Sequence, residues 1–118
     1  DAGDAVLEAV ARVLKRSVRR EDIVCRFGGE EFTIIMPGNT KEAARRRAEL
    51  ILDRVRHLEI QHGSHVFPQL TISIGLAFFP QDGDSADDLI QAADWALLEA
   101  KRQGRNRLVM AGEIVPKS

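Results

Sequence analysis

Two adjacent glutamates follow two adjacent glycines in the segment Gly28-Gly29-Glu30-Glu31-Phe32. Glycine suits a tight turn because it tolerates positive φ, but a turn gains nothing from two like charges that repel each other. Carboxylate oxygens are the ligands that a hard cation such as Mg²⁺ prefers, and this ion commonly keeps sites for water and for substrate phosphates. The segment therefore indicates either a cation site that serves a phosphorylated ligand or a solvated acidic turn.

Other charged residues that suit an anionic ligand lie at the ends of predicted helices. Asp4 lies near the start of one helix, and Lys101 and Arg105 lie near the end of another. The helix dipole alone favours a carboxylate at the first position and cations at the second. The tetrad Arg19-Arg20-Glu21-Asp22 contains an Arg-x-x-Asp pattern, in which arginine can fork onto a phosphate. An ordinary charged helix end has the same pattern, so both interpretations stay open from the residues alone.

Three segments carry apolar residues at the period of an amphipathic helix. The apolar stripes run from Leu7 to Val18, from Ala44 to Leu58 and from Leu89 to Ala100. Thr40 is the expected N-cap of the second helix, and Ser85 begins a capping-box pattern for the third. These helices must position the charged residues at their ends.

Strand patterns lie between the predicted helices. Residues 23–27 and 32–36 are β-rich runs that the glycine turn would join as a hairpin. Large and small residues alternate strictly over residues 70–78, which predicts a half-buried strand. Residues 107–110 form a short last strand, and residues 59–68 are expected to form a loop with room for short strands. The order α-β-β-α-β-α-β predicts an α+β fold, with helices packed on one side of a mostly antiparallel sheet.

The composition excludes several classes of protein. The chain has 118 residues, 44% of them apolar and 30% charged, which suits one soluble domain. A net charge of −1 argues against nucleic acid as a partner, because such binding relies on many cations. No run approaches the roughly 20 apolar residues that direct membrane insertion needs. The single cysteine excludes an internal disulfide and favours a reducing, cytoplasmic location.

The segment 28–32 resembles the signature hairpin of GGDEF domains, the diguanylate cyclases. Further segments match patterns of this family in the same order, from residue 2 to about residue 110. This ordered set is far more specific than the acidic turn alone. The resemblance implies a GGDEF domain over residues 1–112, with a palm-like, nucleotidyl-cyclase-like and ferredoxin-like core, and a tail over residues 113–118. The further segments are Gly3-Asp4-Ala5-Val6-Leu7, Asp22 to Phe27, Leu70 to Gly75, Ala93-Asp94, Ala100-Lys101 and Gly104-Arg105-Asn106.

This resemblance implies an enzyme that condenses two GTP molecules into cyclic di-GMP and two pyrophosphates, with Mg²⁺ or Mn²⁺ as cofactor. Each domain carries one half-site, and two domains meet in a two-fold homodimer. Glu30 and Glu31 are the expected catalytic residues: Glu30 ligates the metal, and Glu31 borders the reacting hydroxyl. The expected substrate-binding residues are Asp4 at the guanine, Gly29 under the nucleotide, and Lys101 and Arg105 at the triphosphate.

Arg19 and Asp22 match the Arg-x-x-Asp inhibitory site of the family, which binds the cyclic dinucleotide product. The site commonly recruits another arginine, for which Arg45, Arg46 and Arg47 are all candidates. The alternative function is a catalytically incompetent module that binds cyclic di-GMP or only dimerises. The intact acidic motif favours the cyclase.

The family's domain normally begins before the position of Asp1, with a central strand and a helix that contribute to the metal and guanine sites. We therefore expect this chain to lack that first strand and helix, to leave two sheet edges unpaired, and to turn over GTP poorly by itself. The resemblance also implies an upstream sensor or receiver domain in a parent protein, which could be membrane-anchored. Trp95 is expected to pack against the rest of the domain rather than to stack on a base.

Overall fold

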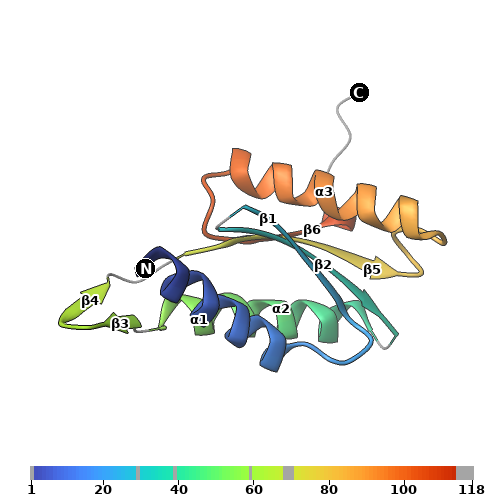
Figure 1. The fold of residues 1–118 in the computed structure, drawn as a ribbon. Helices are drawn as coiled ribbons and strands as arrows, with labels where there is room; N and C mark the ends of the chain where they lie inside the picture. Colours follow the sequence, from blue (N-terminus) through green and yellow to red (C-terminus); the bar gives the residue numbers. More distant parts are fainter. Residues whose placement is uncertain (1, 29, 39, 59, 68–70, 114–118) are drawn as a thin grey trace.

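The computed structural model describes residues 2–28, 30–38, 40–58, 60–67 and 71–113 (Figure 1). The side chains of residues 2–7, 26–28, 60–62 and 65–67 lie outside that description. Within these ranges, no helix is both long and apolar enough to cross a bilayer. The elements are α1 (Ala2–Ser17), β1 (Ile23–Gly28), β2 (Glu31–Pro37), α2 (Lys41–Arg56), β3 (Ile60–His62), β4 (His65–Phe67), β5 (Ser73–Phe79), α3 (Ala86–Arg102), β6 (Leu108–Met110) and the 3₁₀-helix η1 (Ala111–Glu113).

The helices begin where the sequence predicts. Thr40 Oγ1 accepts a hydrogen bond from the backbone nitrogen of Ala43 at 3.2 Å, and caps α2. Ser85 Oγ accepts from the backbone nitrogen of Asp88 at 3.1 Å, and caps α3. The predicted apolar stripes are buried within both helices, whereas Leu58 lies beyond the end of α2 and is half-buried. Local capping and periodicity therefore explain these two helices.

The described strands form a four-stranded sheet in the order β1-β2-β5-β6, and β3 pairs with β4 in a separate hairpin. β1 and β2 are antiparallel, as their short connection requires. The pairs β2–β5 and β5–β6 are parallel, because α2 and α3 serve as crossovers between them. The sheet is therefore mixed, and the expectation of a mostly antiparallel sheet is wrong. β2 and β5 pair along their whole length, from Glu31 opposite Ser73 to Pro37 opposite Phe79.

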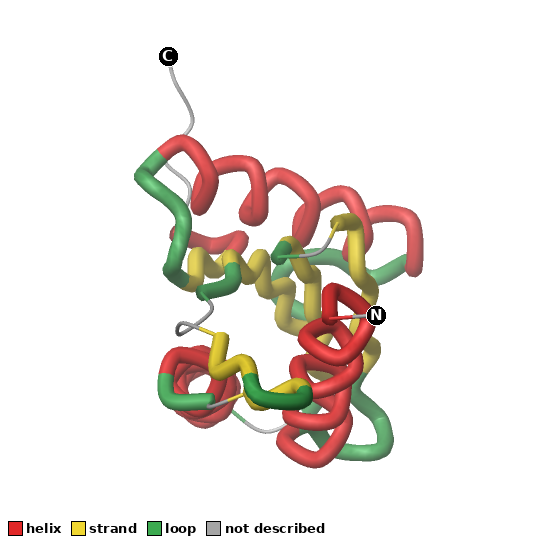
Figure 2. Tube along the Cα trace, turned by 60° about the vertical axis from the view of Figure 1, so that its left-hand side comes forward, coloured by secondary structure: helices red, strands yellow, loops and turns green. Residues whose placement is uncertain are grey.

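Helices cover both faces of this sheet. Figures 1 and 2 show α3 on one side of the strands and α1 and α2 on the other. One buried cluster joins α1 and α2 to the sheet, and smaller clusters join α3 to the opposite face. β5 is consequently buried on both faces from Ser73 to Phe78. The predictions of a half-buried strand and of helices on one side are wrong, because the small side chains of β5 face a helix rather than water.

Gly75 permits this close contact between β5 and α3. A Cβ atom at Gly75 would overlap the backbone of Ala93 and Leu97, and would lie 2.8 Å from Leu97 Cα. These neighbours are backbone atoms of a helix, so they cannot move aside as a flexible side chain would. The depth at which α3 packs therefore depends on the absence of a side chain at position 75.

Gly75→Ala is expected to lower the free energy of unfolding by about 3 kcal/mol, at the upper end of the usual cost of overpacking. Urea denaturation followed by circular dichroism measures this change. Ser64→Ala in the exposed β3–β4 turn is the control, and should change stability by less than about 0.5 kcal/mol. An unchanged urea midpoint for Gly75→Ala would show that α3 does not pack at this depth.

Candidate active site

The acidic pair lies where the β1–β2 hairpin meets the centre of the sheet. Glu30 is exposed in the turn, and Glu31 is the first residue of β2. The backbone nitrogen of Ser73 donates a hydrogen bond to Glu30 O at 2.9 Å, so β5 anchors the turn from the neighbouring strand. Two adjacent carboxylates are thereby attached to the rigid part of the fold.

Glu31 forms ion pairs with two cations from the C-terminal part of the chain. Lys101 Nζ lies 3.3 Å from Glu31 Oε1, and Arg105 Nη1 lies 3.1 Å from Glu31 Oε2. The partners are 70 and 74 residues away along the sequence. The structure thus brings three of the sequence-predicted site residues together, with one carboxylate between two cations. We refer to Glu31, Lys101 and Arg105 as the charge cluster.

The charge cluster holds Glu31 in its ionised form. The hydrogen bond from Arg105 lowers the pKa of the Glu31 carboxyl, partial burial opposes this shift, and the hydrogen bond and charge of Lys101 lower the pKa further. The side chain of Glu31 is 23% exposed, so a ligand from solvent can reach it. The cluster carries one net positive charge, which suits an incoming anion.

The turn after α3 places Arg105 in this cluster. Gly104 ends the helix as predicted: its φ is 118°, and the backbone nitrogen of Arg105 donates to Ala100 O at 2.9 Å. This pattern is a Schellman C-cap, which reverses the chain directly after a helix. Lys101 in the last turn of α3 and Arg105 beyond the cap therefore both reach Glu31.

A cavity of about 310 Å³ adjoins the charge cluster, lined in part by Glu31 and Lys101. Asp94 also lines it, and among the described residues no hydrogen-bond partner reaches its buried Oδ1. Leu97 lines it from the buried stripe of α3, and Trp95 and Leu98 complete the wall. Trp95 and Leu98 are 59% and 53% exposed, so the expectation that Trp95 packs is wrong. Sequence reasoning did not assign Asp94, Trp95 or Leu98 to the site. The sequence signal that could have identified them is that they lie on the third predicted helix but outside its stripe of buried alanines and leucines.

The Arg-x-x-Asp pattern forms a second cluster. The Asp22 side chain is fully buried, and it accepts hydrogen bonds from the backbone nitrogen of Arg19 at 2.7 Å and from Arg47 Nη2 at 3.2 Å. Arg47 is therefore the arginine that joins Asp22, whereas Arg45 pairs with Glu49 at 3.2 Å. Two guanidinium groups share one carboxylate, and their Nε atoms are buried without a hydrogen-bond partner in the described part of the chain.

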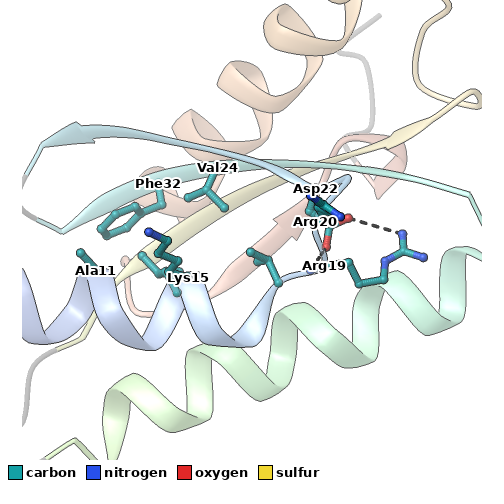
Figure 3. A pocket seen from close by; sticks show the side chains of 9 residues that line it. Ala11, Lys15, Arg19, Arg20, Asp22, Val24 and Phe32 are labelled. Carbon is teal, nitrogen blue, oxygen red and sulfur yellow. Dashed lines mark hydrogen bonds and ion pairs between the residues drawn. The ribbon is translucent and has the colours of Figure 1, made fainter.

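A cavity of about 550 Å³ extends from Arg19 and Asp22 along α1 and the first two strands. Figure 3 shows Ala11, Val24 and Phe32 at one end of this cavity and the Arg19–Asp22 pair at the other. Apolar side chains line much of the cavity, with Lys15 near Ala11 and Phe32 and the arginines and Asp22 at the other end.

Asp4 and Gly29 are the two remaining predicted substrate-binding residues. Asp4 belongs to α1, but its side chain lies outside the described residues, as does all of Gly29. Among the residues that the structure describes, no group of three or more Asp, Glu, His or Cys side chains could hold a metal ion. Glu30 and Glu31 are consecutive in the sequence and supply the carboxylates at this site. Their oxygens fit Mg²⁺, which commonly binds one or two carboxylates together with substrate phosphates and water.

Glu31→Gln is expected to lower stability by about 0.5 kcal/mol at pH 7, the scale of a partly exposed ion pair. The pKa of Glu31 is lower in the folded state than in the unfolded state. The ionised side chain therefore stabilises the fold above the ordinary carboxyl pKa, and this stabilisation is lost as the pH falls through the folded-state pKa. Urea denaturation at pH 7 and pH 2.5 should therefore show a larger difference between the variant and the wild type at pH 7 than at pH 2.5. The control Glu8→Gln removes the same charge from an exposed position. An equal difference at both pH values would contradict the ion pairs.

Comparison with known proteins assigns the chain to a family. A family model described as "Diguanylate cyclase, GGDEF domain" matches residues 1–107. The chain is 38% identical over 117 residues to diguanylate cyclase A of Treponema denticola, covering 99% of this chain and 31% of that protein. It is 40% identical over 111 residues to the response regulator PleD of Caulobacter vibrioides, covering 92% of this chain and 24% of that protein. The chain thus spans less than a third of the length of these relatives.

Solved structures agree with this assignment. The GGDEF domain of DgcB from Caulobacter crescentus, crystallised in complex with c-di-GMP, matches with a TM-score of 0.74 and 29% identity, covering 93% of this chain and 65% of that one. The GGDEF domain of YfiN from Pseudomonas aeruginosa matches with a TM-score of 0.73 and 31% identity, covering 93% and 64%. The acidic hairpin, the fold and the match over residues 1–107 together show that this chain belongs to the GGDEF family of diguanylate cyclases.

Proposed function

We propose that this chain binds GTP at the charge cluster and that two copies condense two GTP molecules into cyclic di-GMP. The single observation that carries the proposal is the convergence of Lys101 and Arg105 on Glu31, whose neighbour in the sequence is the exposed Glu30. A triphosphate needs cations, and a reacting hydroxyl needs a nearby acceptor for its proton. Membership of the family supports the same reaction.

The cations bind the triphosphate in this proposal. The Lys101 ammonium acts as a compact point charge, and the planar Arg105 guanidinium can donate two parallel hydrogen bonds to phosphate oxygens. Both groups leave Glu31 when the more highly charged phosphate arrives. Positioning of this kind supplies much of the rate enhancement in phosphoryl transfer.

The carboxylates act at the reacting end of the nucleotide. Glu31 accepts a hydrogen bond from the 3′-hydroxyl and can take its proton as a general base. The 3′-oxygen forms a bond to the α-phosphorus of the other nucleotide, and the bond from that phosphorus to the bridging oxygen breaks, so pyrophosphate leaves. Glu30 would hold Mg²⁺. When bound, this ion neutralises phosphate charge and eases deprotonation of the hydroxyl.

Two copies are required because each hydroxyl attacks the nucleotide held by the opposite domain. A two-fold homodimer places two identical half-sites face to face, which is the usual symmetry of such an arrangement. We also infer that a parent protein carries a regulatory domain that controls this encounter. The relative named as a response regulator, of which this chain spans 24%, supports that inference.

The Asp22 cluster is the proposed site of product inhibition. Its two arginines carry more positive charge than Asp22 neutralises, and their buried Nε groups lack hydrogen-bond partners among the described residues. Cyclic di-GMP supplies two phosphates and guanine edges for such donors. The same observation favours a second candidate function, a module that binds cyclic di-GMP without catalysis.

Calorimetry with GTPγS plus Mg²⁺ and with cyclic di-GMP separates these functions. Lys101→Ala is expected to weaken GTPγS binding about tenfold and to leave cyclic di-GMP binding unchanged, because one charge-assisted hydrogen bond contributes at least about 1.4 kcal/mol. Arg47→Ala is expected to give the opposite pattern. Each variant serves as the control for the other. Binding of cyclic di-GMP without any binding of GTPγS would support the catalytically incompetent module, and failure to bind either ligand would contradict both functions.

A further inference from the structure

An arginine of a different helix holds the turn that carries Arg105. Arg56, the last residue of α2, donates from Nε to Asn106 Oδ1 and from Nη2 to Asn106 O, both at 2.8 Å. Arg56 and Asn106 are 50 residues apart along the sequence. The two bonds form a fork that fixes the side chain and the backbone of Asn106 at once, because the guanidinium is planar.

This turn needs an external support. Gly104, Arg105 and Asn106 all lie in the left-handed region, with φ values of 118°, 64° and 50°. Glycine adopts this conformation readily and asparagine tolerates it, but a long side chain such as that of Arg105 rarely does. Unfavourable backbone conformations of this kind persist where the surrounding structure determines them, and they are frequent at functional sites.

Other hydrogen bonds hold the two sides of the turn. The backbone nitrogen of Arg105 donates to Ala100 O at 2.9 Å, and Arg107 Nε donates to Arg105 O at 3.0 Å. The backbone nitrogen of Ile74 in β5 also donates to Arg107 O at 2.9 Å, so these bonds hold the residues on either side of Asn106. Arg56 belongs to a helix on the opposite face of the sheet, so its fork ties the turn to a separate part of the fold (Figure 1).

We propose that Arg56 is a positioning residue for the triphosphate site, whose fork onto Asn106 keeps the Arg105 guanidinium beside Glu31. The inference rests on the proposed function, because it matters for catalysis only if Arg105 binds phosphate. Arg56 itself does not contact the charge cluster among the contacts of the described residues. Its effect on phosphate binding therefore passes through Asn106 and Arg105.

The first test measures the position of Arg105 without any ligand. NMR titration of the Glu31 carboxyl carbon should show a lowered pKa in the wild type, because Arg105 and Lys101 donate to it. Arg56→Ala should raise this pKa toward the ordinary value, and Arg105→Ala should raise it at least as far. Arg54→Ala is the matched control, since it removes the same charge from the same turn of α2 and Arg54 contacts Ser17 instead. It should leave the pKa of Glu31 unchanged.

The second test measures binding of inorganic tripolyphosphate by calorimetry without divalent cations. Arg105→Ala should weaken binding about tenfold and Arg56→Ala about threefold, which corresponds to about 0.7 kcal/mol for the second variant. Arg56→Lys, which cannot form the fork, should fall between Arg56→Ala and the wild type. In the Arg105→Ala background, Arg56→Ala should have no further effect, whereas a general loss of structure or charge would add to it.

The outcomes distinguish the two proposals. If Arg56→Ala behaves like Arg54→Ala in both tests while Arg105→Ala weakens binding, the positioning role is wrong and the phosphate site stands. If the wild type does not bind tripolyphosphate, the proposed function fails, and the pKa of Glu31 in Arg56→Ala still decides whether Arg56 positions Arg105. Should Arg56→Ala unfold, Asn106→Ala removes the side-chain half of the fork and should shift the pKa of Glu31 in the same direction.

Discussion

The ion pairs of Glu31 with Lys101 and Arg105 join the hairpin to the end of α3, and the rest of the site depends on that contact. Three features of the fold produce it. The hydrogen bond from Ser73 to Glu30 fixes the acidic turn against β5, the missing side chain at Gly75 lets α3 pack closely on the same strand, and the helix cap at Gly104 turns the chain back toward β2. A carboxylate and two cations that are far apart in sequence are thereby brought into contact.

The charge cluster is also consistent with mutual dependence between nucleotide and metal. Without a ligand, the carboxylate of Glu31 and its two cations partly neutralise one another. A triphosphate that binds Lys101 and Arg105 would release Glu31, whose negative charge would then favour a divalent cation held by Glu30. In the proposed function each ligand therefore increases the affinity for the other, and the coupling is reciprocal. The cluster stays compact without a ligand because its charges have opposite sign.

Much of this arrangement could be predicted from the sequence, and the rest depends on contacts that sequence patterns do not encode. Capping residues and apolar periodicity predicted α2 and α3, and the glycine turn predicted the hairpin, because these signals are local. The alternation along β5 suggested a solvent-facing side, but small side chains equally suit a helix packed at close range, as Gly75 shows. Sequence proximity left three arginines as candidates for Asp22, and only the orientation of α2 selects Arg47. Arg56 gave no signal, since its partner Asn106 lies 50 residues away.

The central claim is that Glu31 competes with phosphate for Lys101 and Arg105, and the affinity of Glu31→Gln for tripolyphosphate tests it most directly. Calorimetry in the absence of divalent cations should show tighter binding to Glu31→Gln than to the wild type, by about twofold if the ion pairs contribute about 0.5 kcal/mol. Glu8→Gln accounts for the general effect of removing a negative charge. Affinity for Glu31→Gln that equals or falls below that of the wild type would contradict the account, because it would mean that Glu31 does not occupy the phosphate-binding cations.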